Sequence, residues 1–135
     1  MDDELVIWND DFSVGFEPID KQHKELAMMT NELFEQCKQG ASAADKTFFQ
    51  TIKKAGDYAR IHFSDEEKYM QQAKFPNIRE HIKQHSDFLD TVIKSLSDFE
   101  AGKTAPIELA RFLKKWLLNH IAVSDKEYAP YLAKL

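Results

Sequence analysis

The residues with the clearest chemical potential are histidines and acidic residues that recur at helical spacing. His62 and Glu66 form one i, i+4 pair, and His81 and His85 form another. Residues four apart in a helix lie one turn apart on one face, so each pair can direct both side chains at one point. Imidazole combined with carboxylate suits iron, zinc, copper or nickel, whereas calcium and magnesium prefer oxygen ligands. The spacing therefore predicts a transition-metal site.

Four helices are expected to position these side chains. The predicted breaks in the apolar pattern contain glycine or proline and lie at 40–42, 75–77 and 102–106. The predicted helices span about 19–38, 43–73, 77–100 and 106–123, after an N-terminal arm over 1–18. Apolar residues repeat every three or four positions in each helix, which is typical of a helix that buries one face. Because short connections favour antiparallel neighbours, we expect one all-α domain over 1–135, an up-down-up-down antiparallel four-helix bundle with a short C-terminal segment.

All five histidines fall on the predicted inward faces of these helices. They are His23, His62, His81, His85 and His120. A single buried histidine is commonly a hydrogen-bonded core residue, but burying five polar rings together is costly unless they share a partner. Counted from the connecting loops at about 1.5 Å per residue, the five rings and Glu66 lie at one level, toward the 75–77 end of the bundle. We therefore expect one site built from four helices.

The number of ligands indicates two metal ions. Five imidazole nitrogens are too many for one tetrahedral zinc ion. Asp125 is a second candidate bridge beside Glu66, but it follows His120 by five positions, a spacing that a straight α-helix splays apart, so we expect the helix to loosen after Val123 and to break at Ser124. If both carboxylates and a solvent-derived oxo or hydroxo group bridge the ions, the histidines divide three and two. One ion is then closed by six ligands, and the other keeps an open position for a small molecule.

Along nearly its whole length the chain resembles the hemerythrin family, and within it the bacteriohemerythrin group of non-haem di-iron oxygen-binding proteins. The matching segments are WNDDFSVGF at 8–16, IDKQH at 19–23, HFSDEE at 62–67, HIKQH at 81–85 and WLLNHIAVSD at 116–125. The resemblance implies two iron ions per chain, Fe2+ in the deoxy form and Fe3+ in the oxy and met forms. It implies that His81, His85 and His120 hold one iron, that His23 and His62 hold the other, and that Glu66, Asp125 and an oxo or hydroxo group bridge them.

The function that this resemblance implies is reversible binding of O2 for storage, transport or delivery to oxygen-requiring enzymes, without catalysis. The ligand types favour a carrier, because di-iron enzymes of the ferritin-like class use a carboxylate-rich set that includes Glu-x-x-His, whereas imidazoles dominate here. Leu117, near His120, is expected to line the O2 pocket. Two alternatives stay open: a di-iron oxidase, peroxidase or nitric-oxide-handling enzyme with the same ligands, and an oxygen or redox sensor.

Composition and charge narrow the expected partners and compartment. The 18 basic and 23 acidic residues give a formal net charge of -5, which argues against a nucleic-acid partner. No apolar run approaches the ~20 residues of a membrane span, and the first 18 residues lack the apolar stretch of a secretory signal. The single cysteine, Cys37, cannot form an internal disulfide. We expect a bacterial, cytoplasmic monomer whose partners are O2 and an oxygen-consuming enzyme, with Asp65 and Glu67 as solvated surface charges.

Overall fold

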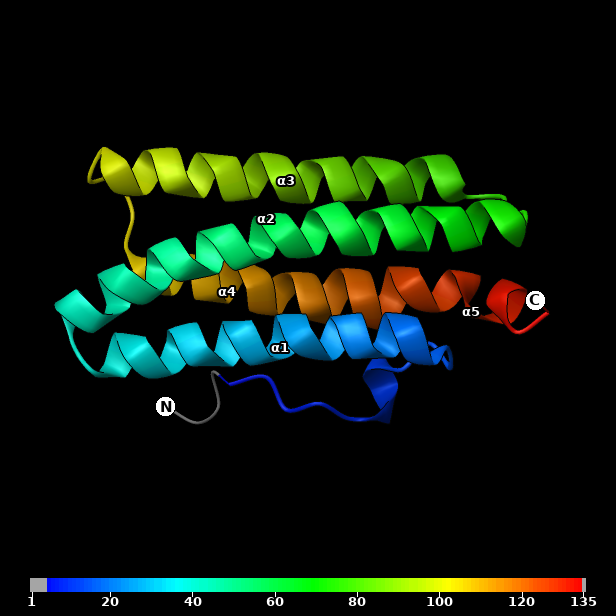
Figure 1. The fold of residues 1–135 in the computed structure, drawn as a ribbon, viewed down its shortest axis with the longest axis horizontal. Helices are drawn as coiled ribbons and strands as arrows, with labels where there is room; N and C mark the ends of the chain where they lie inside the picture. Colours follow the sequence, from blue (N-terminus) through cyan, green and yellow to red (C-terminus); the bar gives the residue numbers. More distant parts are fainter. Residues whose placement is uncertain (1–4, 135) are drawn as a thin grey trace.

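The computed structural model of the chain describes residues 5–134, apart from the side chains of residues 11 and 122–124, so the first four residues of the expected arm lie outside it. The elements in chain order are the 3-10 turn η2 (Asp10–Phe12), α1 (Glu17–Lys38), α2 (Ala41–Gln72), α3 (Ile78–Glu100), α4 (Pro106–Trp116), the π-helix η3 (Leu117–Asp125) and α5 (Lys126–Leu132). Figure 1 shows α1, α2, α3 and the continuous α4–η3–α5 side by side, with successive helices joined at opposite ends of the bundle. The predicted all-α, up-down-up-down four-helix bundle is confirmed. Within residues 5–134 there is no strand, and no helix is long and apolar enough to cross a membrane.

Proline and glycine set the helix boundaries, with small differences from the predicted ones. Pro18 occupies the first turn of α1, where its missing N–H costs no hydrogen bond, so the helix begins at Glu17 rather than after the proline. Gly40 has a φ of 113°, in the region that favours glycine, and α2 begins directly after it at Ala41. Pro106 lies in the first turn of α4, where the sequence placed the start of the fourth helix.

The fourth helix differs from the predicted one in length and in internal geometry. The chain stays helical from Pro106 to Leu132 instead of ending near Val123. The geometry changes at Leu117, where the α-helix gives way to nine residues of π-helix. Because a π-helix closes its hydrogen bonds between residues five apart, it widens the turn without interrupting the helix. The predicted break at Ser124 is therefore wrong.

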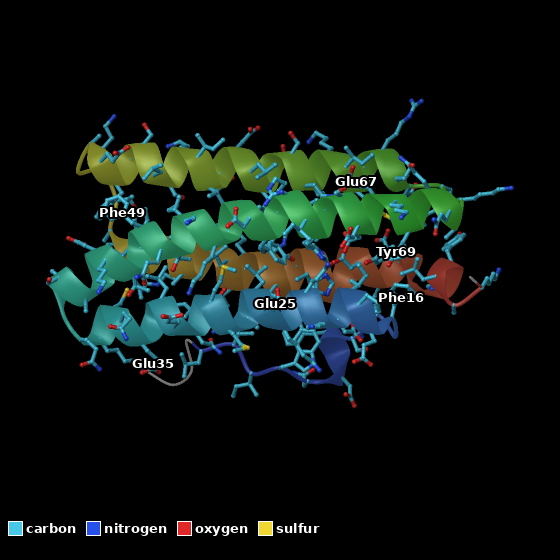
Figure 2. The ribbon with its side chains drawn as sticks, viewed as in Figure 1. Phe16, Glu25, Glu35, Phe49, Glu67 and Tyr69 are labelled. Carbon is cyan, nitrogen blue, oxygen red and sulfur yellow. The ribbon has the colours of Figure 1, made fainter. Side chains whose placement is uncertain are left out.

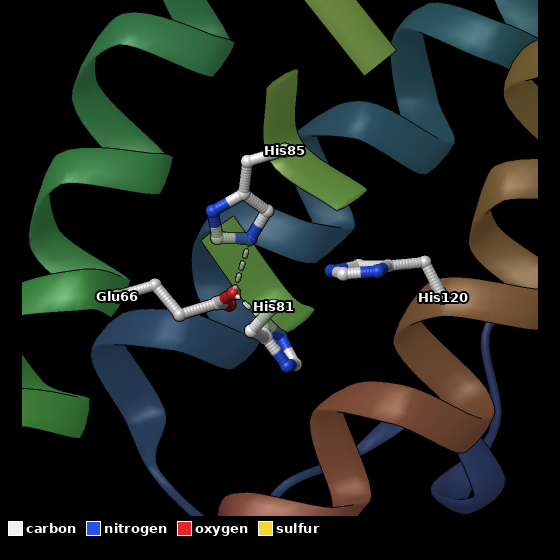
Figure 3. Close-up of side chains that lie close together, drawn as sticks. All are labelled: Glu66, His81, His85 and His120. Carbon is white, nitrogen blue, oxygen red and sulfur yellow. Dashed lines mark hydrogen bonds and ion pairs between the residues drawn. The ribbon is translucent and has the colours of Figure 1, made fainter. Parts of the chain in front are cut away.

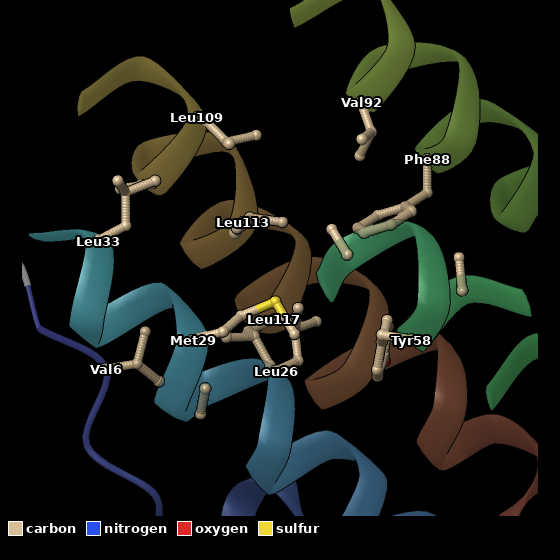
Figure 4. Packing of buried hydrophobic residues seen from close by; sticks show 14 of the residues in the cluster. Val6, Leu26, Met29, Leu33, Tyr58, Phe88, Val92, Leu109, Leu113 and Leu117 are labelled. Atoms are coloured by element: carbon tan, nitrogen blue, oxygen red, sulfur yellow. The ribbon is translucent and has the colours of Figure 1, made fainter. Parts of the chain in front are cut away.

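Apolar side chains fill the bundle in two clusters, one on each side of a polar layer. The larger cluster includes Leu26, Phe88 and Leu113 and extends toward the connection between α3 and α4 (Figure 4). The smaller cluster includes Met70 and Phe75 and lies where α2 meets α3. All five histidines and two buried carboxylates lie where the larger cluster gives way to the smaller one along the helices. The polar layer is therefore closed off by apolar packing from both directions.

The N-terminal arm packs along α1 and is fixed to it by side-chain hydrogen bonds. The Asn31 amide accepts a hydrogen bond from the Val6 backbone N–H at 2.6 Å and donates one to the Val6 carbonyl at 2.7 Å. Phe12 is buried in the larger cluster. Phe16 meets Tyr69 of α2 edge-on, with ring centroids 4.8 Å apart (Figure 2). The arm thus covers one side of the bundle and does not enter the polar layer.

Candidate metal centre

Seven potential metal ligands meet in the polar layer. They are His23 on α1, His62 and Glu66 on α2, His81 and His85 on α3, and His120 and Asp125 on η3. Every one of these side chains is at most 4% exposed. They form two groups that share Glu66, and within each group the potential ligand atoms lie within 4.8 Å of one another. The structure therefore brings together all seven residues that the sequence singled out.

The π-helix explains how Asp125 joins the site. In an α-helix, residues five apart point about 140° away from each other, because each residue turns the chain by about 100°. In a π-helix the repeating hydrogen bond itself spans five residues, so positions i and i+5 come close to the same face. His120 and Asp125 stand in this relation within η3, and His120 Nε2 lies 3.0 Å from Asp125 Oδ1. Widening of the helix, rather than a break, brings the carboxylate into the site.

The Glu66 carboxylate faces both halves of the site, and Figure 3 shows it with His81, His85 and His120 on one of them. Its Oε1 atom lies 2.9 Å from His85 Nε2 and 3.3 Å from His81 Nε2. Its Oε2 atom lies 3.0 Å from His62 Nε2 and 3.5 Å from His23 Nε2. One oxygen thus serves each half, which is the arrangement that a bridging carboxylate requires.

Asp125 spans the site in the same way from the opposite side of the bundle. Its Oδ1 atom lies 2.5 Å from His81 Nε2 and 3.0 Å from His120 Nε2. Its Oδ2 atom lies 3.1 Å from His23 Nε2. Each of the two carboxylates therefore directs one oxygen at histidines of α3 or η3 and the other at the α1–α2 pair.

An outer hydrogen-bond chain fixes the orientation of His62. His62 Nδ1 lies 2.5 Å from Gln22 Oε1, and Gln22 Nε2 donates to Asp65 Oδ2 at 2.9 Å. Since the bond to Asp65 places the amide nitrogen of Gln22 away from the ring, the amide oxygen accepts the Nδ1–H of His62. His62 Nε2 therefore carries a lone pair that points into the site. Asp65, expected to be a solvated charge, instead takes part in this chain.

Two further histidines are oriented from outside in the same manner. His85 Nδ1 donates to Glu67 Oε2 at 2.9 Å, so Glu67, marked in Figure 2, is a hydrogen-bond partner rather than a free surface charge. His120 Nδ1 lies 2.5 Å from Gln84 Oε1. Such outer partners hold the tautomer and ring orientation of metal-binding histidines. The inner Nε2 atoms of both rings are therefore left as potential ligands.

The two buried carboxylates of the layer strongly favour positive charge on the groups around them. Burial opposes protonation of His23 and His81, but hydrogen bonds and charges from the two carboxylates outweigh it and raise the pKa of His23 to about 9 and that of His81 to about 10. Burial lowers the pKa of His62. Burial alone would raise the pKa values of Glu66 and Asp125, yet the surrounding histidines hold both well below their ordinary range. Two buried carboxylates thus stay ionised and must be neutralised by cations.

Two of the inward polar atoms that the structure describes in the layer lack a hydrogen-bond partner, and others meet at short distances. Among the described residues, His120 Nε2 and Asp125 Oδ2 have no hydrogen-bond partner, although each lies within 3.1 Å of an oppositely polar atom. His23 Nε2 and His62 Nε2 face each other at 3.1 Å. Buried polar atoms without partners are rare, so converging lone pairs and anionic oxygens indicate a cation between them. The layer fits a metal site.

Comparison with known proteins identifies this architecture. A family model described as the hemerythrin HHE cation-binding domain matches residues 14–132. The chain belongs to the hemerythrin family. The family membership expected from the sequence is thereby confirmed.

Individual relatives support the same assignment. The chain is 33% identical to a bacteriohemerythrin of Stenotrophomonas maltophilia over 93% of its own length and 80% of the relative's. It is 35% identical to a myohemerythrin of Riftia pachyptila, covering 90% of this chain and 89% of that protein. A crystal structure of wild-type hemerythrin superposes with a TM-score of 0.79 at 29% identity, covering 96% of this chain and 98% of that one. Family membership thus rests on both sequence and fold.

The residues that sequence reasoning missed in this hemerythrin-family site lie just outside the ligands. Each of them is next to a candidate ligand in the chain: Gln22 precedes His23, Gln84 precedes His85 and Glu67 follows Glu66. This adjacency is the only feature of the sequence that could have indicated their role. Leu117, the candidate pocket residue, is fully buried at the first position of η3. It packs in the same cluster as Leu26, which lies three residues after His23 on α1 (Figure 4).

Proposed function

We propose that this chain holds two iron ions in the polar layer and binds O2 reversibly, for oxygen storage, transport or delivery. The observation that carries the proposal is the unequal division of histidines around two carboxylates that each span the site. His81, His85 and His120 lie on one side, and His23 and His62 on the other. With both carboxylates shared, the second ion has one protein ligand fewer than the first, which leaves it a position for a small ligand.

Ferrous ions at this centre would supply the electrons for reversible oxygen binding, and the protein's own residues hold and protect them. The inner Nε2 atoms of His62, His85 and His120 are fixed by acceptors behind their rings. Neutral imidazoles outnumber the two carboxylates, which distinguishes the ligand set from that of carboxylate-rich di-iron enzymes. This composition supports binding without turnover.

Buried apolar residues near the ligands support the same proposal. Leu117 and Leu26 are fully buried and pack in one cluster, and each lies three positions in the chain from a candidate ligand, His120 and His23 respectively. Water at an oxygen-binding centre would promote oxidation of the iron. We propose that Leu117 forms part of the wall that keeps the open position dry.

The decisive experiment is metal analysis combined with optical spectra of the reduced protein before and after exposure to O2. Two iron ions per chain, with a visible band that forms in O2 and disappears on degassing, are the expected result. Steady consumption of O2 with an added reductant would instead indicate an enzyme. A chain that binds no iron at neutral pH would refute the proposal.

A further inference from the structure

Tyr58 carries a buried hydroxyl group that the ligand set does not explain. The residue lies on α2 one turn before His62, and its ring stacks on the His62 ring with centroids 4.8 Å apart and planes inclined by 16°. Its side chain is 7% exposed, and its hydroxyl has no hydrogen-bond partner among the residues that the structure describes. Burying a hydroxyl without a partner is destabilising and rare in native proteins. This suggests that the partner of the hydroxyl is a ligand rather than a residue of the protein.

The other buried tyrosine of the site shows what a purely structural role looks like. Tyr128 on α5 is fully buried, and its hydroxyl donates a hydrogen bond to Glu66 Oε2 at 2.8 Å. The hydroxyl of Tyr128 thus has an acceptor within the protein, the carboxylate of Glu66. Tyr58 lies near the same charges but has no such acceptor.

A groove leads from the surface to Tyr58. It lies between α1 and α2, has a volume of about 980 Å³, and reaches two inner residues, Tyr58 and His62, past Gln22 and Met29. His62 belongs to the side of the site with two histidines, where the proposed open position lies. Tyr58 and His62 therefore line the groove together, on the side of the centre that has two histidines.

The hydroxyl of Tyr58 is available as a hydrogen-bond donor. A tyrosine ordinarily has a pKa of about 10, so its phenol carries the proton at physiological pH. A neutral phenol beside anionic groups can donate a hydrogen bond to a ligand that gains negative charge on binding.

We propose that Tyr58 is a ligand-binding residue whose hydroxyl donates a hydrogen bond to the small exogenous ligand on the His23/His62 side of the centre. This rests on the proposed function only in requiring iron at the site. The ligand class is a molecule of two or three atoms with an exposed acceptor atom, such as O2 or a small linear anion. No proton is transferred, since the hydroxyl only donates a hydrogen bond.

The test is the variant Tyr58→Phe, which removes one oxygen atom and keeps the packing and the stacking on His62. Azide serves as the probe, because this small anion binds ferric iron and its complex absorbs visible light. We expect Y58F to load as much iron as the wild type and to bind azide about tenfold to a hundredfold more weakly in the diferric form. The iron-free variant should melt at the same or a higher temperature, since an unsatisfied buried hydroxyl is removed. Release of O2 from the oxygenated protein should be faster by a similar factor.

Tyr69→Phe is the matched control. Tyr69 is on the same helix but packs against Phe16 at the bundle end, and its loss should leave azide affinity unchanged. Azide affinity in Y58F within twofold of the wild type would overturn the proposal. Should Y58F fail to fold, the infrared azide stretch of the wild type in H2O and D2O provides a second test, and the absence of any isotope shift would overturn it.

The outcomes separate this proposal from the proposed function. If the wild type loads iron and binds azide but not O2, the oxygen-binding function fails while Tyr58 is still tested by azide. If O2 binds reversibly and Y58F binds azide as the wild type does, only the role of Tyr58 fails. If no iron is bound, both fail.

Discussion

His120 Nε2 and Asp125 Oδ1 lie 3.0 Å apart although five positions separate the two residues in the chain. The nine-residue π-helix η3 makes this contact possible, because its hydrogen-bond period equals the spacing of the pair. π-Helical turns are rare and are found frequently at functional sites. The wide turn therefore lets one helix supply both a histidine and a bridging carboxylate, and this role explains why the unusual geometry is present.

Replacing Asp125 by asparagine should reduce iron binding from two ions per chain to one or fewer. The substitution keeps the size of the side chain but removes the charge that faces His81, His120 and His23. Iron per chain, measured after reconstitution at neutral pH, checks this. Asp90→Asn, an exposed position on α3, is the control and should keep two ions. A D125N variant with full iron content and a wild-type spectrum would contradict the bridging role.

The sequence was sufficient to predict the bundle and the inward placement of the ligands because both follow from local periodicity. The pairs His62 with Glu66 and His81 with His85 share a helical face by virtue of i, i+4 spacing alone. The i, i+5 spacing of His120 and Asp125 indicated a distortion but not its form. A break and a widened turn satisfy the same spacing, and tertiary packing decides between them.

The outer partners and the orphan hydroxyl were beyond reach of sequence reasoning for a different reason. Gln22 contacts His62 across 40 positions, and Gln84 contacts His120 across 36. Such pairs join different helices, so they depend on the rotation and register of the bundle and leave no periodic trace. The sequence does not single out Tyr58, because a missing hydrogen bond is visible only once every neighbour is placed.

The iron-free protein should become less stable between pH 7 and pH 10. The pKa values of His23 and His81 are raised to about 9 and about 10 in the folded chain, against 6.5 in the unfolded one. Protonation of these rings therefore stabilises the fold fully below pH 6.5, and the contribution is lost as the pH rises through the folded values. We expect a loss of several kcal/mol in the free energy of unfolding.

Urea denaturation of the iron-free protein at pH 7, 8.5 and 10 measures this loss. The double variant His23→Gln with His81→Gln is the control, and its stability should change much less over the same range. A wild-type stability that is constant from pH 7 to 10 would contradict the raised pKa values. Since iron requires neutral imidazole, loading at pH 7 should also release protons from these two rings.

Replacing Glu67 by alanine should weaken iron binding by about tenfold to a hundredfold, the usual effect of losing an outer partner of a metal ligand. The change leaves His85 Nδ1 without its acceptor at 2.9 Å and frees the ring to turn. Competition with a chelator gives the relative affinities. Glu80→Ala, which removes an exposed carboxylate from α3, should leave the affinity unchanged. Equal affinities for E67A and E80A would show that Glu67 does not orient the ring.

Replacing Leu117 by alanine should speed oxidation of the oxygenated protein, because a cavity beside the two-histidine side admits water. The same substitution should lower the free energy of unfolding by about 2–5 kcal/mol, the usual cost of a buried leucine truncated to alanine. Leu113→Ala is a matched control, since Leu113 is equally buried one turn earlier on α4 and lies farther from His120 in the chain. We expect both variants to be destabilised to a similar extent and only L117A to oxidise faster, by about tenfold or more, as followed by decay of the visible band. Equal oxidation rates would show that lost packing in general, rather than the wall that Leu117 forms at the open position, controls the lifetime of the oxygenated state.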